Sequence, residues 1–207
     1  MAGGSASGRA RALKAFGLKP ADIILTEQVH GNSVLVVDRK YLKKRHKAPV
    51  KADALITNIR GVILGILTAD CLPIFLYDSA RKAVALIHCG WRPLSKGIIP
   101  EVINRLSDEF SVAPRGLAVV FGPAIRECCY EVGSDFSDFT KESLTRRGNK
   151  LYFDLCREAK KRLAACGVCE GRIYDSRICT KCMNGDFFSY RKEGLGAGRS
   201  LSLLGLK

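Results

Sequence analysis

The residues of this sequence best suited to chemistry are a cysteine and two histidines that follow apolar runs. Cys71 comes just after the run 61–67, and His88 comes directly after the run 83–87. His30 follows a third such run. Short apolar runs that are rich in β-branched residues and bounded by Gly or Asp are typical of buried strands. Functional side chains are often found where a rigid strand gives way to a loop. One thiol and two imidazoles at strand ends are therefore placed to meet in space.

The ligand types of His30, Cys71 and His88 suit zinc. Three protein ligands leave a fourth coordination position open for water, which is the pattern of catalytic rather than structural zinc. Zinc lowers the pKa of such a water toward about 7. We expect the carboxylate of Asp70 to orient a ligand or the water. The same ligands also fit a mononuclear copper site, although we expect zinc in preference to copper. A multicopper oxidase is disfavoured, because it needs many more imidazoles than the three in this chain.

Two other interpretations stay open at this point. Cys71 as a nucleophile with His88 as its base would make a cysteine hydrolase, and the sequence alone does not separate this from zinc. The chain also has 34 basic and 20 acidic residues, a net charge of +14, and a basic run at 39–47. A basic nucleic-acid-binding protein with structural zinc is the interpretation from a different class. A charge run alone specifies no partner, so we expect a solvated surface there.

A second group of cysteines forms two C-x-x-C pairs. Nine residues separate the pairs, fewer than the usual spacing of about 15–20 between pairs. The pattern predicts a four-thiolate centre for structural zinc or an iron–sulfur cluster, against the alternative that these are core or incidental cysteines. The four residues are Cys166, Cys169, Cys179 and Cys182. No chemistry is predicted for the adjacent Cys128 and Cys129.

Composition indicates one domain over residues 1–207, with 47% hydrophobic residues available for a core. No stretch approaches the ~18 apolar residues of a membrane helix, and the first residues lack an apolar signal sequence. Nine cysteines without such a signal favour the reducing cytoplasm.

The apolar patterning predicts an α+β protein with a mixed sheet, since many strands accompany a few helices without strict alternation. We expect helices over 9–16, 94–110, 135–145 and 154–166. We expect strands near 22–29, 33–38, 53–57, 61–68, 72–77, 83–88, 117–121, 172–175, 186–190 and 200–205.

Taken together, these motifs resemble the bacterial YfiH/YlmD-like family, to which the human laccase-domain-containing protein is related. The matching segments run in family order from about residue 9 to the C-terminus, which makes the set specific. They are 28–31, 53–57, 68–74, 88–92, 122–125, 131–133, 187–191 and 198–199.

The resemblance implies a layered α/β sandwich and a purine nucleoside enzyme. The implied reactions are phosphorolysis of adenosine, inosine and methylthioadenosine, and deamination of adenosine. It also implies zinc on His30, Cys71 and His88. Purine nucleosides and phosphate are then the partners, and we expect Gln28, Arg92 and Arg191 to contact them. The guanidinium groups of the two arginines suit phosphate, which such groups bind bidentately.

Three departures from the family pattern stand out. The usual N-terminal segment with a Gly-Gly-Val-Ser-like motif is missing from this sequence, so any substrate contact it makes is absent or replaced. Pro93 stands where a Gly usually follows Trp-Arg, and Ala197 replaces the Thr of a Thr-Gly-Arg motif. We expect the last two changes to reshape loops.

Overall fold

The structure is a computed structural model that describes residues 13–14, 17–44, 48–133, 136, 139 and 141–207. The predicted helix 9–16 lies outside these residues except for 13–14, which are helical. Among the described residues, no helix is long and apolar enough to cross a membrane.

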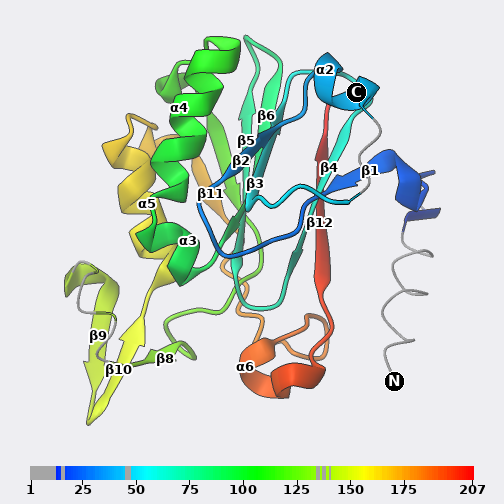
Figure 1. Cartoon of the computed structure of the whole chain (residues 1–207). Helices are drawn as coiled ribbons and strands as arrows, with labels where there is room; N and C mark the ends of the chain where they lie inside the picture. Colours follow the sequence, from blue (N-terminus) through cyan, green and yellow to red (C-terminus); the bar gives the residue numbers. More distant parts are fainter. Residues whose placement is uncertain (1–12, 15–16, 45–47, 134–135, 137–138, 140) are drawn as a thin grey trace.

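A mixed six-stranded sheet forms the centre of the molecule, with strand order β11-β7-β5-β6-β3-β2 (Figure 1). β5 pairs antiparallel with both β6 and β7, and β3 pairs antiparallel with β6. The two edge pairs, β2 with β3 and β11 with β7, are parallel. The strands are β2 (Val34–Val36), β3 (Ala54–Thr57), β5 (Leu72–Asp78), β6 (Ala83–Cys89), β7 (Ala118–Phe121) and β11 (Ile173–Asp175).

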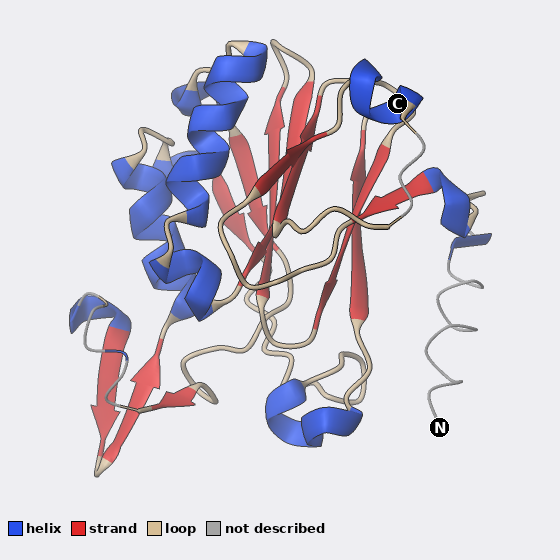
Figure 2. Cartoon of the chain, viewed as in Figure 1, coloured by secondary structure: helices blue, strands red, loops and turns tan. Residues whose placement is uncertain are grey.

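A smaller sheet of order β1-β4-β12 packs on one face of the central sheet, and helices cover the other face (Figure 2). Its strands are β1 (Ile23–Leu25), β4 (Ile63–Thr68) and β12 (Ser200–Gly205). Successive side chains of β6 alternate between the two layers: Ile87 packs under the helices and Leu86 packs toward the small sheet. A strand buried on both faces reads as a continuous apolar run, which is why it was visible in the sequence. The predicted layered sandwich with a mixed sheet is confirmed.

The helical layer consists of α3 (Trp91–Ser95), α4 (Ile98–Phe110) and α5 (Leu155–Ala165). The prediction of one helix over 94–110 is wrong, because Gly97 adopts a left-handed conformation with φ 79° and separates α3 from α4. Pro100 lies in the first turn of α4, where a missing N–H costs no hydrogen bond. The predicted helix 154–166 corresponds to α5, and the carboxylate of Asp154 caps it by accepting from the N–H of Arg157.

Two local predictions fail outside the central layers. Part of the predicted helix 135–145 lies outside the described residues; of the rest, 141–143 form a 3-10 turn and 144–145 begin a strand. That strand belongs to a third sheet made of β8 (Glu131–Val132), β9 (Leu144–Arg147) and β10 (Lys150–Phe153). The aromatic segment 186–190 is not a strand, because the N–H of Phe187 donates to Met183 and starts a local turn instead of a ladder. It leads into α6 (Tyr190–Glu193).

The remaining elements are short. The basic run begins with α2 (Arg39–Lys43), and residues 45–47 lie outside the described part of the chain. Since β2 runs parallel to β3 and antiparallel to β6, α2 lies at the opposite end of the sheet from the C-terminus of β6 (Figure 1). Among the described residues, 3-10 turns span Pro20–Asp22, Pro114–Gly116, Lys141–Ser143, Glu170–Arg172 and Gly194–Gly196.

Candidate active site

The structure brings His30, Cys71 and His88 together at one end of the central sheet. One ligand atom from each residue lies within 4.8 Å of the other two. His88 belongs to β6, Cys71 ends the turn that joins β4 to β5, and His30 lies in the connection from β1 to β2. The register pairs Pro73 with His88, so the residues just before β5 lie beside the end of β6. Three segments that are distant in sequence thus converge at one point.

His88 is held in a fixed orientation by a buried carboxylate. The residue is 3% exposed, and Nδ1 of its imidazole lies 2.8 Å from Oδ1 of Asp53. With the Nδ1 proton donated to Asp53, the lone pair of Nε2 is available to a metal or a proton. Burial alone would lower the pKa of His88, but the hydrogen bond to Asp53 and the interaction with Cys71 raise it to about 9.

Asp53 also builds the loop that carries His30. Its fully buried carboxylate accepts the backbone N–H groups of Val29, His30 and Gly31, at 3.2, 3.0 and 2.7 Å. His30 lies in the left-handed region with φ 55°, and these bonds stabilise that conformation. Burial raises the pKa of Asp53, but the bonds from His88 and the loop outweigh it and lower the pKa below its usual range. Asp53 therefore links two of the three potential ligands, a role that was not predicted from the sequence.

Cys71 is a half-buried thiol in contact with both histidines. Burial would raise its pKa, but the interactions with His30 and His88 lower it to about 6. Gly90 makes room for the sulfur, since a Cβ at position 90 would lie 2.8 Å from Sγ of Cys71. The glycine after His88-Cys89 is thus required by the close approach of two chain segments.

We expect Gly90→Ala to weaken metal binding at this site by about tenfold or more, as do other changes that displace the partners of metal ligands. The added methyl group forces the sulfur of Cys71 away from the two imidazoles. Isothermal titration of metal-free protein with zinc measures the effect. Gly185→Ala is the matched control, because a Cβ there meets nothing within 4 Å. Equal zinc affinities for Gly90→Ala and Gly185→Ala would show that the site accommodates the added methyl group without displacing the sulfur of Cys71.

The carboxylate of Asp70 bonds to two other segments. Its Oδ1 accepts from Oγ1 of Thr180 at 2.6 Å, and its Oδ2 accepts from the N–H of Arg191 at 2.7 Å. Asp70 itself has φ 83°, a strained conformation for a residue with a side chain. Asp53 is thus the carboxylate that bonds to a histidine, whereas Asp70 bonds to the segments of Thr180 and Arg191. The role of Asp70 in orienting a ligand or the water stays a prediction.

A cavity of about 1240 Å³ opens over His30, Cys71 and His88. Four cationic side chains line it: Arg92, Lys181, Arg191 and Arg199. Aromatic side chains line it as well, and the guanidinium of Arg191 lies over the ring of Tyr130, 4.9 Å from its centroid. The cavity thus combines cations that suit an anionic group with flat rings that suit a planar one.

Gln28 lines the same cavity, but its side-chain amide is engaged by the protein. Nε2 donates to the carbonyl of Leu67 at 2.8 Å, and Oε1 accepts the N–H of Leu67 at 2.7 Å. These paired bonds fasten the residues after β1 to β4. The contact of Gln28 with a substrate stays a prediction, and the bonds to Leu67 give it a structural task.

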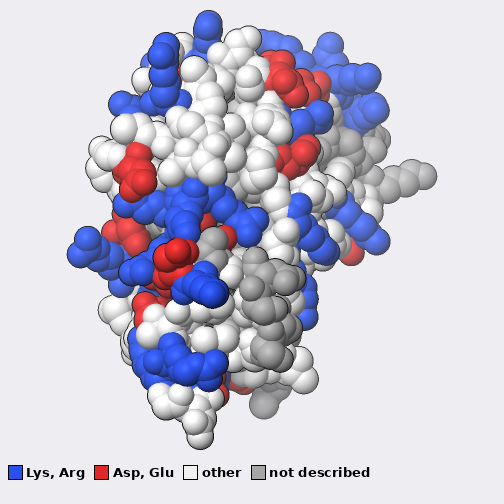
Figure 3. All heavy atoms as spheres, turned by 90° about the vertical axis from the view of Figure 1, so that its left-hand side faces the viewer, with Lys and Arg blue, Asp and Glu red and all other residues white. Residues whose placement is uncertain are grey.

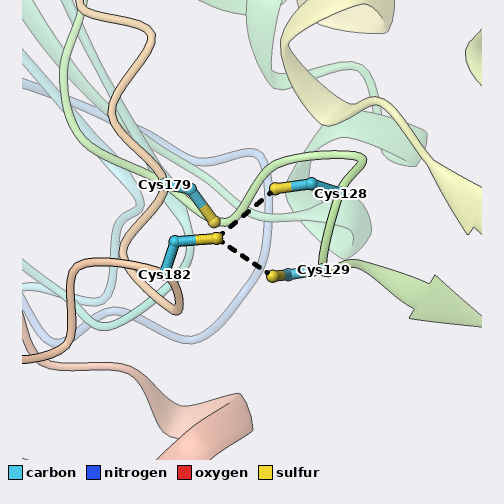
Figure 4. A group of neighbouring side chains, drawn as sticks. All are labelled: Cys128, Cys129, Cys179 and Cys182. Carbon is cyan, nitrogen blue, oxygen red and sulfur yellow. Dashed lines mark hydrogen bonds between the residues drawn. The ribbon is translucent and has the colours of Figure 1, made fainter.

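The predicted centre of Cys166, Cys169, Cys179 and Cys182 is wrong. Cys166 caps the end of α5 and Cys169 precedes β11, whereas Cys179 and Cys182 follow that strand. β11 therefore carries the two C-x-x-C pairs to opposite ends of the sheet. Among the described residues, the thiols that meet Cys179 and Cys182 are those of Cys128 and Cys129 (Figure 4).

Residues 5–207 match the model of the family described as multi-copper polyphenol oxidoreductase laccase. Adenosine deaminase RL5 from an unknown prokaryotic organism is 29% identical over 200 residues, which cover 90% of this chain and 76% of that protein. Purine nucleoside phosphorylase from Bacteroides thetaiotaomicron is 31% identical, covering 88% of this chain and 73% of its own. Purine nucleoside phosphorylase YfiH from Escherichia coli K12 is 33% identical, covering 94% and 78%.

Solved structures show the same architecture. The crystal structure of YlmD from Geobacillus stearothermophilus aligns with a TM-score of 0.88 at 29% identity, covering 96% of this chain and 78% of that one. The hypothetical protein YfiH from Bacillus licheniformis aligns with a TM-score of 0.88 at 25% identity, covering 97% and 80%.

Proposed function

Because this chain belongs to the family described as multi-copper polyphenol oxidoreductase laccase, and proteins named YfiH and YlmD are similar to it, we propose that it is a zinc-dependent enzyme that acts on purine nucleosides. The proposed reactions are phosphorolysis of adenosine, inosine and methylthioadenosine, and deamination of adenosine. The observation that carries the proposal is the convergence of His30, Cys71 and His88 beneath a cavity lined by cations and aromatic rings.

The donor set fits zinc. His88 presents Nε2 because Asp53 takes Nδ1, and the low pKa of Cys71 favours the thiolate that a metal requires. His30 would be the third ligand, leaving one position open. When bound there, zinc supplies Lewis-acid catalysis at neutral pH. Copper centres of the multicopper type need more imidazoles than the three histidines of this sequence.

The other residues of the cavity would bind and orient the substrates. In phosphorolysis, a phosphate oxygen forms a bond to C1′ of the ribose as the C1′–N9 bond breaks and the purine takes up a proton. Arg92 and Arg191 are placed to bind that phosphate, with Asp70 fixing the backbone of Arg191. The aromatic side chains that line the cavity offer rings to the purine. In deamination, water replaces the amino group at C6 and ammonia leaves.

Product analysis tests this function. Zinc-loaded protein incubated with adenosine and phosphate should release adenine and ribose 1-phosphate, and with adenosine alone it should release inosine and ammonia. Chromatography separates all four products. Unchanged adenosine under both conditions, with protein shown to contain zinc and to be folded, would rule the function out.

A cysteine hydrolase is the second candidate, and one observation favours it. Asp53, His88 and Cys71 lie in series as carboxylate, imidazole and thiol, the arrangement of an acid–base–nucleophile triad. A triad, however, gives the imidazole of His30 no clear task. We therefore rank it below the zinc enzyme.

The pH dependence of Cys71 alkylation separates the two candidates. In metal-free protein the rate should rise with pH and reach half its maximum near pH 6, because the thiolate reacts and the thiol does not. Bound zinc should suppress the reaction across the whole range. Iodoacetamide labelling followed by peptide mass mapping measures it, with the buried Cys89, whose pKa is raised, as an unreactive internal reference. Fast labelling of fully active, zinc-treated protein would support the hydrolase.

The charge distribution does not favour nucleic acid as the partner. On the helical face, Asp and Glu side chains lie among more extensive groups of Lys and Arg side chains (Figure 3). Lys161 of α5 pairs with Glu142 at 2.9 Å, and Arg105 of α4 pairs with Glu109 at 3.7 Å, all with exposed side chains. A nucleic-acid surface needs unneutralised cations along a phosphate track, so mixed charge of this kind supports the small-molecule proposal instead.

A further inference from the structure

Four cysteines outside the candidate active site converge on a single point. Their sulfur atoms all lie within 4.8 Å of one another. The sulfur of Cys182 lies 3.4 Å from that of Cys129 and 3.7 Å from that of Cys128. Figure 4 shows the four side chains pointing toward a common centre from two loops. All four are free thiols, and Cys128 and Cys182 are exposed, so an apolar core does not account for their grouping.

Backbone bonds hold the two loops in this arrangement. Cys128 and Cys129 lie in the turn that follows Ala124, and Ala124 forms a parallel bridge with Cys179. The N–H of Thr180 donates to the carbonyl of Ala124 at 3.1 Å, and Nε of Arg126 donates to Ile178 at 3.2 Å. The guanidinium of Arg126 also forms two bonds to Asp175, at 2.8 and 2.6 Å. The thiols are therefore brought together by a preformed scaffold.

We propose that Cys128, Cys129, Cys179 and Cys182 bind a structural zinc ion. A tetrahedral centre with Zn–S bonds of about 2.3 Å places its sulfurs about 3.8 Å apart, close to the separations in this cluster. An iron–sulfur cluster spreads its cysteine ligands around several metal atoms, which needs wider separations. Four protein thiolates leave no open position, so the site is structural and takes no part in the chemistry.

The zinc would fix one wall of the cavity over the candidate active site. Thr180, between the two cysteines of the C-x-x-C pair, donates to the carboxylate of Asp70. Cys129 and Lys181 line the cavity directly. Metal binding at the cluster thus joins the turn after β7 to the loop that positions Asp70. This assignment does not depend on the proposed function, because it concerns only the four thiolates.

Metal content tests the site in the whole protein. Protein that is produced in zinc-containing medium and purified under reducing conditions should contain two zinc ions per chain, as measured by elemental mass spectrometry. Cys71→Ser should keep one ion and Cys182→Ser should keep one, while Cys169→Ser, which alters an exposed cysteine outside the cluster, should keep two. If Cys182→Ser, Cys128→Ser and the unaltered protein contain equal amounts of zinc, the site does not exist.

The absorption spectrum of cobalt-substituted Cys71→Ser protein identifies the atoms that bind the metal, and it leaves the four cysteines of the cluster unaltered. The protein should show the intense thiolate-to-cobalt charge transfer and ligand-field bands of a tetrahedral four-sulfur centre. Thiol titration under native conditions should find these four cysteines protected until a chelator is added. Rapid reaction of all four thiols in zinc-treated protein, a disulfide among them in reduced preparations, or iron in place of zinc would each overturn the assignment.

Discussion

Replacing Cys71 by serine should lower kcat/KM for adenosine phosphorolysis and for adenosine deamination together, by about 10³-fold or more. The physical reason is the loss of a thiolate ligand and with it of the metal. Metal Lewis acids supply several kcal/mol of transition-state stabilisation, and about 1.4 kcal/mol corresponds to a tenfold rate. Steady-state kinetics on both reactions measure the effect.

The matched control is Cys169→Ser, which removes an exposed thiol far along the chain from the site and should keep both activities. Removal of zinc from the unaltered protein by a strong chelator should stop both reactions as the substitution does, and added zinc should restore both. If deamination persisted while phosphorolysis vanished, the two reactions would not share the His30–Cys71–His88 site.

Asp53→Asn should weaken zinc binding by about 10- to 100-fold, the usual cost of removing a carboxylate that orients a metal-bound histidine. The amide offers one acceptor oxygen where the carboxylate offers two, yet four N–H groups converge on that position. The loop of His30 and the ring of His88 are therefore both released. A buried donor left without a partner costs a further ~1–3 kcal/mol of folding stability.

Zinc titration and thermal unfolding of Asp53→Asn measure the two effects. Asp108→Asn, an exposed change on α4, is the control and should alter neither. Wild-type zinc affinity in Asp53→Asn would mean that His88 keeps its orientation without the carboxylate. It would contradict the role of Asp53 in positioning the metal ligands.

The inner strands of the central sheet were predictable because they are largely apolar and buried. β6 is buried on both faces, so it appears as an uninterrupted apolar run with His88 at its end. The meeting of His30, Cys71 and His88 follows from their common position at strand ends. Asp53 left no comparable signal, because it was predicted only as the first residue of a strand, and its bonds to the His30 loop arise only in the folded chain.

The partners of the C-x-x-C cysteines could not be read from spacing. Cys166 is near in sequence, but the short strand β11 separates it from Cys179 in space. Cys128 is distant in sequence, but the bridge between Ala124 and Cys179 places it within 3.7 Å of Cys182. The break at Gly97 was missed for a related reason, since one left-handed residue ends a helix without disturbing the apolar period on either side.

Anomalous diffraction at the zinc absorption edge tests the central claim most directly. Crystals of active protein should show an anomalous difference peak about 2.0–2.3 Å from the ligand atoms of His30, Cys71 and His88. The peak should be present in data collected above the edge and absent in data collected below it. No peak between these residues, in crystals whose dissolved protein retains full phosphorolysis and deamination, would contradict the account.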